Sequence, residues 1–131
     1  MQSQEQLFAA KIFDQVTKYP GNLPEDNADR KQYGSMAHKL PILVRQAGLV
    51  QALAFVQSRK KDPYIKLLEH IADCLEMNDV DTLMARSRNA DLAEYIYLTN
   101  RVMLALKWYK RFAQSVLKVE PTEDGGDHDG N

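Results

Sequence analysis

Three side chains have both the type and the spacing for metal chemistry. His70, Asp73 and Cys74 stand at positions i, i+3 and i+4 of a helically spaced apolar pattern, so a helix would present them on one face. Such a face could offer ligands to a metal ion, but a closed site needs a second group of ligands and the sequence contains none. We favour the alternative, a solvated His and Asp beside a small buried thiol. The Asp-His-Asp run at 127–129 could hold a cation loosely, and a solvated acidic terminus is the simpler interpretation.

Other forms of catalysis have little support in the sequence. A Ser or Cys nucleophile needs an adjacent base, and no such pairing can be read. The glycines at 34 and 48 are isolated, so there is no Gly-rich loop to hold a phosphate. We therefore predict a protein that is not an enzyme, with no catalytic residue, metal, cofactor or small-molecule substrate.

Basic side chains are more suggestive, above all those near the C-terminal end of the apolar pattern. At 100° per residue, Lys107 and Arg111 fall in a stripe about 40° wide that also contains Asn100 and Lys118. Trp108 and Phe112 lie on the flank of that stripe. Aromatic rings beside Arg and Lys could stack on bases and pair with phosphates. The alternatives are a merely solvated basic face and aromatic rings buried against other helices.

Two further basic groups invite the same two interpretations. Arg59, Lys60 and Lys61 follow a short apolar helix, where cations favour the negative end of the helix dipole and could equally bind phosphates. Lys39 and Arg45 frame Pro41, and periodicity does not decide which of them faces a groove. The predicted phosphate contacts are Lys39, Arg45, Arg59, Lys60, Lys61, Lys107 and Arg111.

The elements that would position these residues are all helical, because apolar residues recur at spacings of three and four. Ser3 and Gln6 form a plausible capping box, Asp62 an N-cap before Pro63, and Gly48 a helix end. At Pro41 we expect a kink or a restart. The sequence predicts a compact all-α bundle of five to six helices with a long C-terminal helix. The expected helical ranges are 4–19, 27–47, 49–58, 62–77, one or two turns within 78–87, and 91–118.

The charge is distributed unevenly along the 131 residues. The chain has 17 Lys and Arg against 18 Asp and Glu, a net charge of −1. Residues 1–119 hold all 17 basic and 13 acidic side chains, which leaves +4 on the predicted helical domain. Residues 120–131 hold five acids and no Lys or Arg, which leaves −5 on a segment that we expect to be a disordered acidic tail. The mildly basic body removes the objection that the overall charge raises against a nucleic-acid partner.

Composition also predicts a cytoplasmic protein. With Cys74 as the single cysteine, no intrachain disulfide can form, which fits a reducing compartment. The first residues lack the basic and apolar regions of a signal peptide. The most apolar stretch, 40–56, is interrupted by Arg45, Gln46 and Gln51 and is too short to span a bilayer.

The segment from Tyr33 to Phe55 resembles a known signature. It is similar to that of the small helical subunit of type III-B CRISPR effector complexes, the fifth Cmr protein family. In that family a Tyr-Gly-x-x-Ala stretch leads through Leu-Pro to Gly-Leu, then Gln and an apolar helix that ends in Phe. The matching residues are Tyr33, Gly34, Ala37, Leu40, Pro41, Gly48, Leu49, Gln51 and Phe55.

The resemblance implies a non-catalytic subunit. Such subunits lie in several copies as a minor filament beside the backbone subunits, and the two filaments enclose the guide RNA and the target RNA. The implied partners are the other Cmr subunits, including the large subunit, further copies of this chain, and both RNAs, with no membrane. One alternative is a packing module that touches only protein. Another is a DNA-binding regulator, for which residues 49–55 are too apolar to read bases. The acidic tail is outside the signature, and it could repel RNA, occupy a basic groove or have no role.

Overall fold

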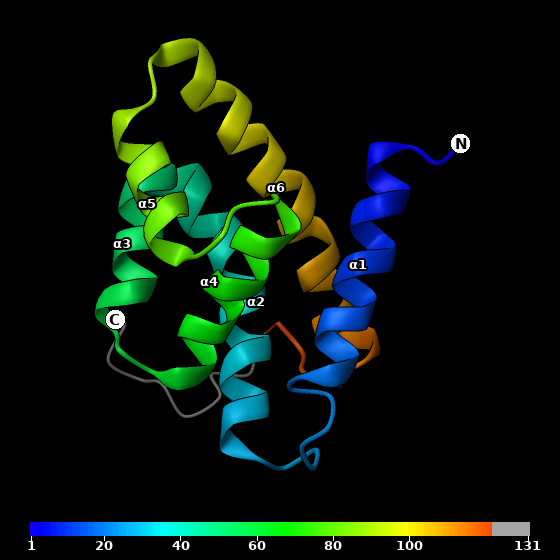
Figure 1. Ribbon diagram of the computed structural model, residues 1–131. Helices are drawn as coiled ribbons and strands as arrows, with labels where there is room; N and C mark the ends of the chain where they lie inside the picture. The colour runs from blue at the N-terminus through cyan, green and yellow to red at the C-terminus, as the bar shows by residue number, and fades with distance from the viewer. Residues whose placement is uncertain (122–131) are drawn as a thin grey trace.

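Six helices joined by short turns form the part of the chain that the computed structural model describes, residues 1–121. The predicted all-α class and the long C-terminal helix are confirmed (Figure 1). Of the predicted acidic tail, only Glu120 and Pro121 belong to the described residues. The helices are α1 (Gln4–Lys18), α2 (Ala28–Ala47), α3 (Leu49–Ser58), α4 (Asp62–Cys74), α5 (Val80–Asn89) and α6 (Leu92–Ser115).

Short polar side chains start four of these helices. The predicted capping box is confirmed at α1, where the Gln6 N–H donates to Ser3 Oγ over 3.1 Å and the Ser3 N–H donates to Gln6 Oε1 over 2.8 Å. Asn27, Asp79 and Asp91 accept backbone N–H groups in the same way at α2, α5 and α6. These caps satisfy donors that a helix leaves unpaired in its first turn.

Helix α4 differs from its predicted bounds at both ends. Its N-cap is Lys61, not Asp62, and Pro63 lies inside the first turn, where its missing N–H leaves no helical bond unmade. The helix ends at Cys74 and not near Met77. Glu76 adopts a left-handed backbone (φ 62°), and the Met77 N–H donates back to the Ala72 carbonyl over 2.8 Å. This reversal closes the helix without a glycine.

Helix α2 is continuous through Pro41, so of the predicted kink or restart the restart is wrong. Proline removes one backbone donor and crowds the preceding turn. Pro41 is itself buried, however, as are Leu40 and Val44 on either side of it. We attribute the continuity to this packing, because α2 contacts α3, α4 and α6.

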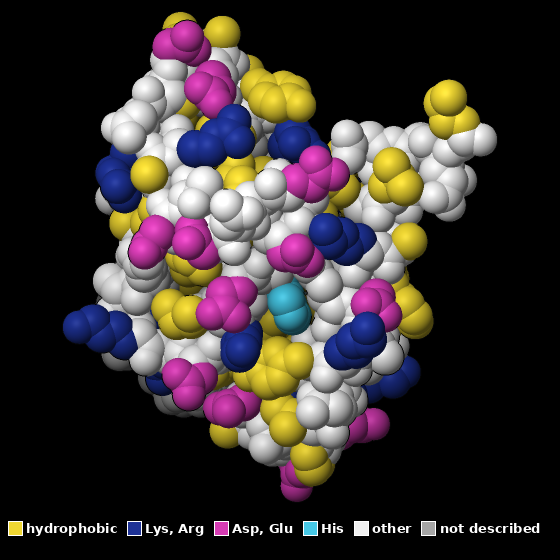
Figure 2. Space-filling view, viewed as in Figure 1, with side chains coloured by type: hydrophobic (Ala, Val, Ile, Leu, Met, Phe, Trp, Pro, Cys, Tyr) yellow, Lys and Arg dark blue, Asp and Glu magenta, His cyan; other side chains and the backbone are white. Residues whose placement is uncertain are grey.

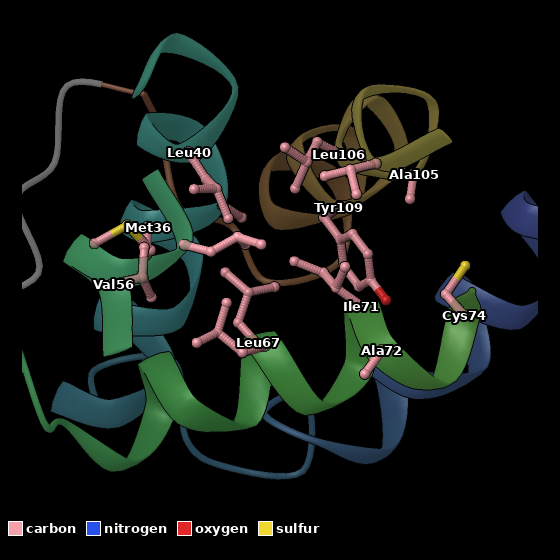
Figure 3. Packing of buried hydrophobic residues seen from close by; sticks show 14 of the residues in the cluster. Met36, Leu40, Val56, Leu67, Ile71, Ala72, Cys74, Ala105, Leu106 and Tyr109 are labelled. Carbon is pink, nitrogen blue, oxygen red and sulfur yellow. The ribbon is translucent and has the colours of Figure 1, made fainter. Parts of the chain in front are cut away.

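The core lies between α2, α4 and α6, with α1 and α3 packed on the outside of that group (Figure 1). Leu40, Leu67, Ile71 and Leu106 are fully buried there and point toward one another (Figure 3). Burying one such side chain contributes about 1.5–3 kcal/mol. The N-terminal turns of α1 extend beyond this packing and form the projection at the upper right of Figure 2.

The segment after α6 turns back and packs on α2. Arg30, which is buried, donates from Nε to the Leu117 carbonyl over 3.2 Å. His38 Nε2 lies 2.8 Å from the Val119 carbonyl. Gly34 leaves room for this segment, since a Cβ at its position would lie 2.7 Å from the Val119 side chain. The Tyr33-Gly34 pair of the signature therefore has a packing role.

Candidate nucleic-acid interface

Helices α2 and α6 together form a basic groove with a volume of about 300 Å³. It brings together three of the seven predicted contacts, Arg45, Lys107 and Arg111, and adds one cation that was not predicted, Lys110. We call it the α2–α6 groove, and its lining residues are Pro41, Arg45, Met103, Lys107, Lys110, Arg111 and Gln114.

The groove has this composition because one face of α6 meets the end of α2. The lining positions of α6 repeat at spacings of three and four, which puts them on one side of the helix. Arg45 stands in the last turn of α2, where a cation also favours the helix dipole. The two helices are far apart in sequence and pack against each other.

The four cations differ in how strongly they are already neutralised. Lys107 pairs with Glu5 of α1, and its Nζ lies 5.7 Å from the centre of the Trp108 ring. Arg45, Lys110 and Arg111 are exposed. Within residues 1–121 these three form no ion pair with an acidic side chain. Among the described residues, the groove therefore has three cations that no acidic side chain neutralises.

Lys110 was missed because the predicted stripe on α6 was too narrow. It stands about 60° from Lys107 on the helix, outside the sector of about 40°. A groove between two helices collects side chains from a wider arc, since the second helix supplies the opposite wall. Lys118 was included wrongly: α6 ends at Ser115, and Lys118 has a left-handed backbone (φ 65°) beyond that end.

The remaining predicted contacts lie elsewhere. Lys39 is half-buried on α2 and does not line the groove, so of the two residues that frame Pro41 it is Arg45 that does. Arg59, Lys60 and Lys61 form the connection between α3 and α4. The Arg59 guanidinium lies 5.6 Å from the centre of the Phe55 ring, and Lys60 is held in a left-handed turn (φ 56°).

Trp108 and Phe112 take part in helix packing. Both are half-buried and pack against the core. The Phe112 ring meets Phe13 of α1 edge to face, with ring centres 5.4 Å apart, and lies 5.6 Å from the Trp108 ring. Burial against other helices therefore describes these two aromatic rings better than exposure for stacking on bases does.

The candidate ligands on α4 do not converge on a common point. His70 is half-buried, and its Nδ1 lies 2.7 Å from the Tyr33 hydroxyl. Asp73 is exposed and pairs with Lys11 over 3.6 Å. Burial raises the pKa of the Cys74 thiol to about 11, so the thiol stays protonated at neutral pH. Among residues 1–121 no three His, Cys, Asp or Glu side chains are grouped to hold a metal ion.

Charges of both signs alternate on the face of the molecule over α4 (Figure 2). The Lys66–Glu69 and Lys11–Asp73 pairs belong to α4 and its contact with α1. Among residues 1–121, the α2–α6 groove is lined by four cations and by no acid, which is a different distribution. None of the six described helices is long and apolar enough to cross a membrane.

Comparison with known proteins places the chain in a family. The family described as CRISPR-associated protein (Cas_Cmr5) matches residues 4–116. A relative from Thermus thermophilus, named CRISPR system Cmr subunit Cmr5, is 40% identical over 118 residues, which cover 90% of this chain and 99% of the relative. The crystal structure of a Cmr5 family protein from the same organism has a TM-score of 0.80 at 41% identity, with 88% of this chain and 98% of that chain covered. As the segment from Tyr33 to Phe55 predicted, the chain belongs to the Cmr5 family of CRISPR-associated proteins.

Proposed function

We propose that this chain is a non-catalytic small subunit of a type III-B CRISPR effector complex and that it contacts RNA through the α2–α6 groove. Family membership supports the first part, since the relative from Thermus thermophilus is named as a Cmr subunit. The observation that carries the second part is the convergence of Arg45, Lys107, Lys110 and Arg111 in one groove. The subunit packs with other Cmr subunits and with further copies of itself as a minor filament in the cytoplasm.

The chemistry of the groove suits an RNA backbone. Arg and Lys bind phosphate oxygens without reading the sequence. In a guide-directed complex base pairing supplies the sequence information, so a subunit needs only backbone contacts. Lys39 and the Arg59–Lys61 turn remain proposed contacts outside the groove, which a separate set of charge reversals would test.

A second candidate function is a packing module that touches only protein. It is favoured by large apolar side chains that are exposed on the N-terminal half of α6, with Leu92 75%, Ile96 51% and Tyr97 57% exposed. Exposed apolar side chains close together indicate contacts with other proteins. This function needs the apolar surface and not the basic groove, so the two candidates predict different effects of salt.

Charge reversal of the groove separates them. We expect the combined variant Arg45→Glu, Lys110→Glu, Arg111→Glu to reduce retention of target RNA by the assembled complex. The slope of log affinity against log salt should fall by about 2–3, because each phosphate contact adds about 0.7–0.9. Fluorescence anisotropy over a salt titration measures both quantities.

The matched control is Lys18→Glu, Lys66→Glu, Arg88→Glu. It changes the net charge equally at exposed positions outside the groove. Circular dichroism should show both variants folded. If the groove variant keeps the affinity and the salt slope of the control, RNA contact through the groove is wrong and the packing module remains.

A further inference from the structure

The chain beyond α6 runs toward the α2–α6 groove. The Leu117 carbonyl accepts a hydrogen bond from Arg30, and the Val119 carbonyl lies within hydrogen-bond distance of His38 Nε2. Between Arg30 and His38 the segment has advanced about 12 Å along α2 in the direction of its C-terminal end. In Figure 1 the segment after α6 passes beside α2.

The last described residues reach the edge of the groove. Gln114, which lines the groove, donates from Nε2 to Glu120 Oε1 over 3.2 Å. Arg45 stands seven residues beyond His38 on α2, which corresponds to about 10 Å along the helix. The backbone therefore leaves the described structure beside the groove with a carboxylate already at its edge.

The residues that follow complement the groove in charge. Residues 122–131 contain four acids, Glu123, Asp124, Asp127 and Asp129, and no Lys or Arg. An extended chain spans up to about 3.3–3.6 Å per residue, so the eight residues 122–129 span up to about 27 Å, which exceeds the distance along α2 to Arg45. The ion pair between Glu5 and Lys107 shows that a carboxylate can bind a cation of this groove.

We propose that the acidic segment 122–131 occupies the α2–α6 groove of the free protein and competes there with RNA phosphates. The competition with RNA rests on the proposed function, whereas the contact between the acidic segment and the groove does not. A short tether gives an effective concentration in the millimolar range, so even weak binding of the tail lowers the apparent RNA affinity. An RNA displaces the tail because it presents many phosphates, whereas a single small anion does not displace it.

The contact is tested in the full chain by nuclear magnetic resonance. The variant neutralises the tail with Glu123→Gln, Asp124→Asn, Asp127→Asn and Asp129→Asn. The control neutralises one Glu and three Asp elsewhere, with Glu25→Gln, Asp14→Asn, Asp26→Asn and Asp81→Asn. We expect the tail variant to shift amide signals of residues 41–46 and 107–114 at low salt. These shifts should disappear near 1 M salt, where the screening length is about 3 Å. Groove signals no different from those of the control would overturn the inference.

The competition is tested with a fluorescein-labelled polyuridine oligonucleotide. The tail variant should bind it about three- to tenfold more tightly than the control, since both have lost the same four charges and the tail variant alone has lost its competitor. Groove shifts with equal affinities for the two variants would overturn the competition. If the charge-reversed groove loses RNA while the tail variant leaves the groove signals unchanged, the proposed function holds and this inference alone fails.

Discussion

At the scale of single residues, His70 is a half-buried polar group held by two hydrogen bonds. Its Nδ1 bonds the hydroxyl of Tyr33, a fully buried residue, and its backbone carbonyl accepts from Gln15 Nε2 over 3.0 Å. Burial lowers the pKa of His70 to about 4 from its ordinary 6.5. Glu69 and Asp73 oppose this shift and Lys66 adds to it. The neutral ring is therefore the folded form, and it leaves Nδ1 free to accept from Tyr33, whose own pKa burial raises well above its ordinary value.

This predicts a loss of stability in acid. Between pH 6.5 and about 4 the unfolded chain protonates His70 and the folded chain does not, so acidification favours unfolding. Stability is fully present above pH 6.5, and its slope below that is at most about 1.4 kcal/mol per pH unit, reduced by the exposed part of the ring. Urea unfolding of the native chain and of His70→Gln at several pH values measures it. If the difference in free energy of unfolding between the two proteins stays constant from pH 7 to about 4.5, His70 is not the group responsible for the loss of stability.

At the scale of elements, the junction of α2 and α3 depends on a third helix. Gly48 joins them with φ 90° and ψ 161°, a conformation that residues with a side chain rarely adopt. As the N-cap residue of α3, Gly48 has no side chain that could accept a backbone N–H. The Val50 N–H instead donates to the Tyr95 hydroxyl of α6 over 3.2 Å. Tyr95 therefore performs from a distance what an N-cap residue performs locally.

We expect Tyr95→Phe to lower the free energy of unfolding by about 1 kcal/mol, because the Val50 N–H loses its acceptor. The control is Tyr97→Phe on the same helix, whose hydroxyl has no hydrogen-bond partner among residues 1–121. It should change stability by less than about 0.5 kcal/mol. Chemical denaturation measures both, and equal effects would show that the hydroxyl does not cap α3.

At the scale of the whole molecule, the segment that follows α6 is attached to α2. Gly34 faces Val119, and Arg30 and His38 bond carbonyls of the same C-terminal segment. This contact explains why a glycine stands at position 34 of the signature, which the helical periodicity of the sequence does not explain. It also sets where the described part of the chain ends, beside α2.

Gly34→Ala should destabilise the chain by about 1–3 kcal/mol, because its new Cβ would lie 2.7 Å from Val119. In a Val119→Gly background Gly34→Ala should lower the free energy of unfolding by less, because the side chain that faces the new Cβ is absent. Urea unfolding of the four proteins gives the coupling between the two positions. Strictly additive costs would show that the close approach does not matter.

Prediction from sequence succeeded where the cause is local. Helical spacing, the Ser3–Gln6 box and Gly48 act within a few residues, and the structure bears them out. It failed where packing opposed a local rule, since burial around Pro41 keeps α2 whole. It also misplaced the N-cap of α4, which is Lys61 and not Asp62. His70 is half-buried and not fully solvated, because the rings of Tyr33 and Tyr19 pack edge-on against it.

The sequence by itself determined the helical class, the long final helix and the family, because periodicity and a contiguous signature are properties of neighbouring residues. Only the tertiary structure decided which cations meet. Arg45 and Lys110 are 65 positions apart and share a groove because α2 packs on α6. Lys39, on the same helix as Arg45, does not line that groove. The buried faces of two helices set the angle at which the helices cross. That packing then determines which charged residues on the exposed faces lie close together.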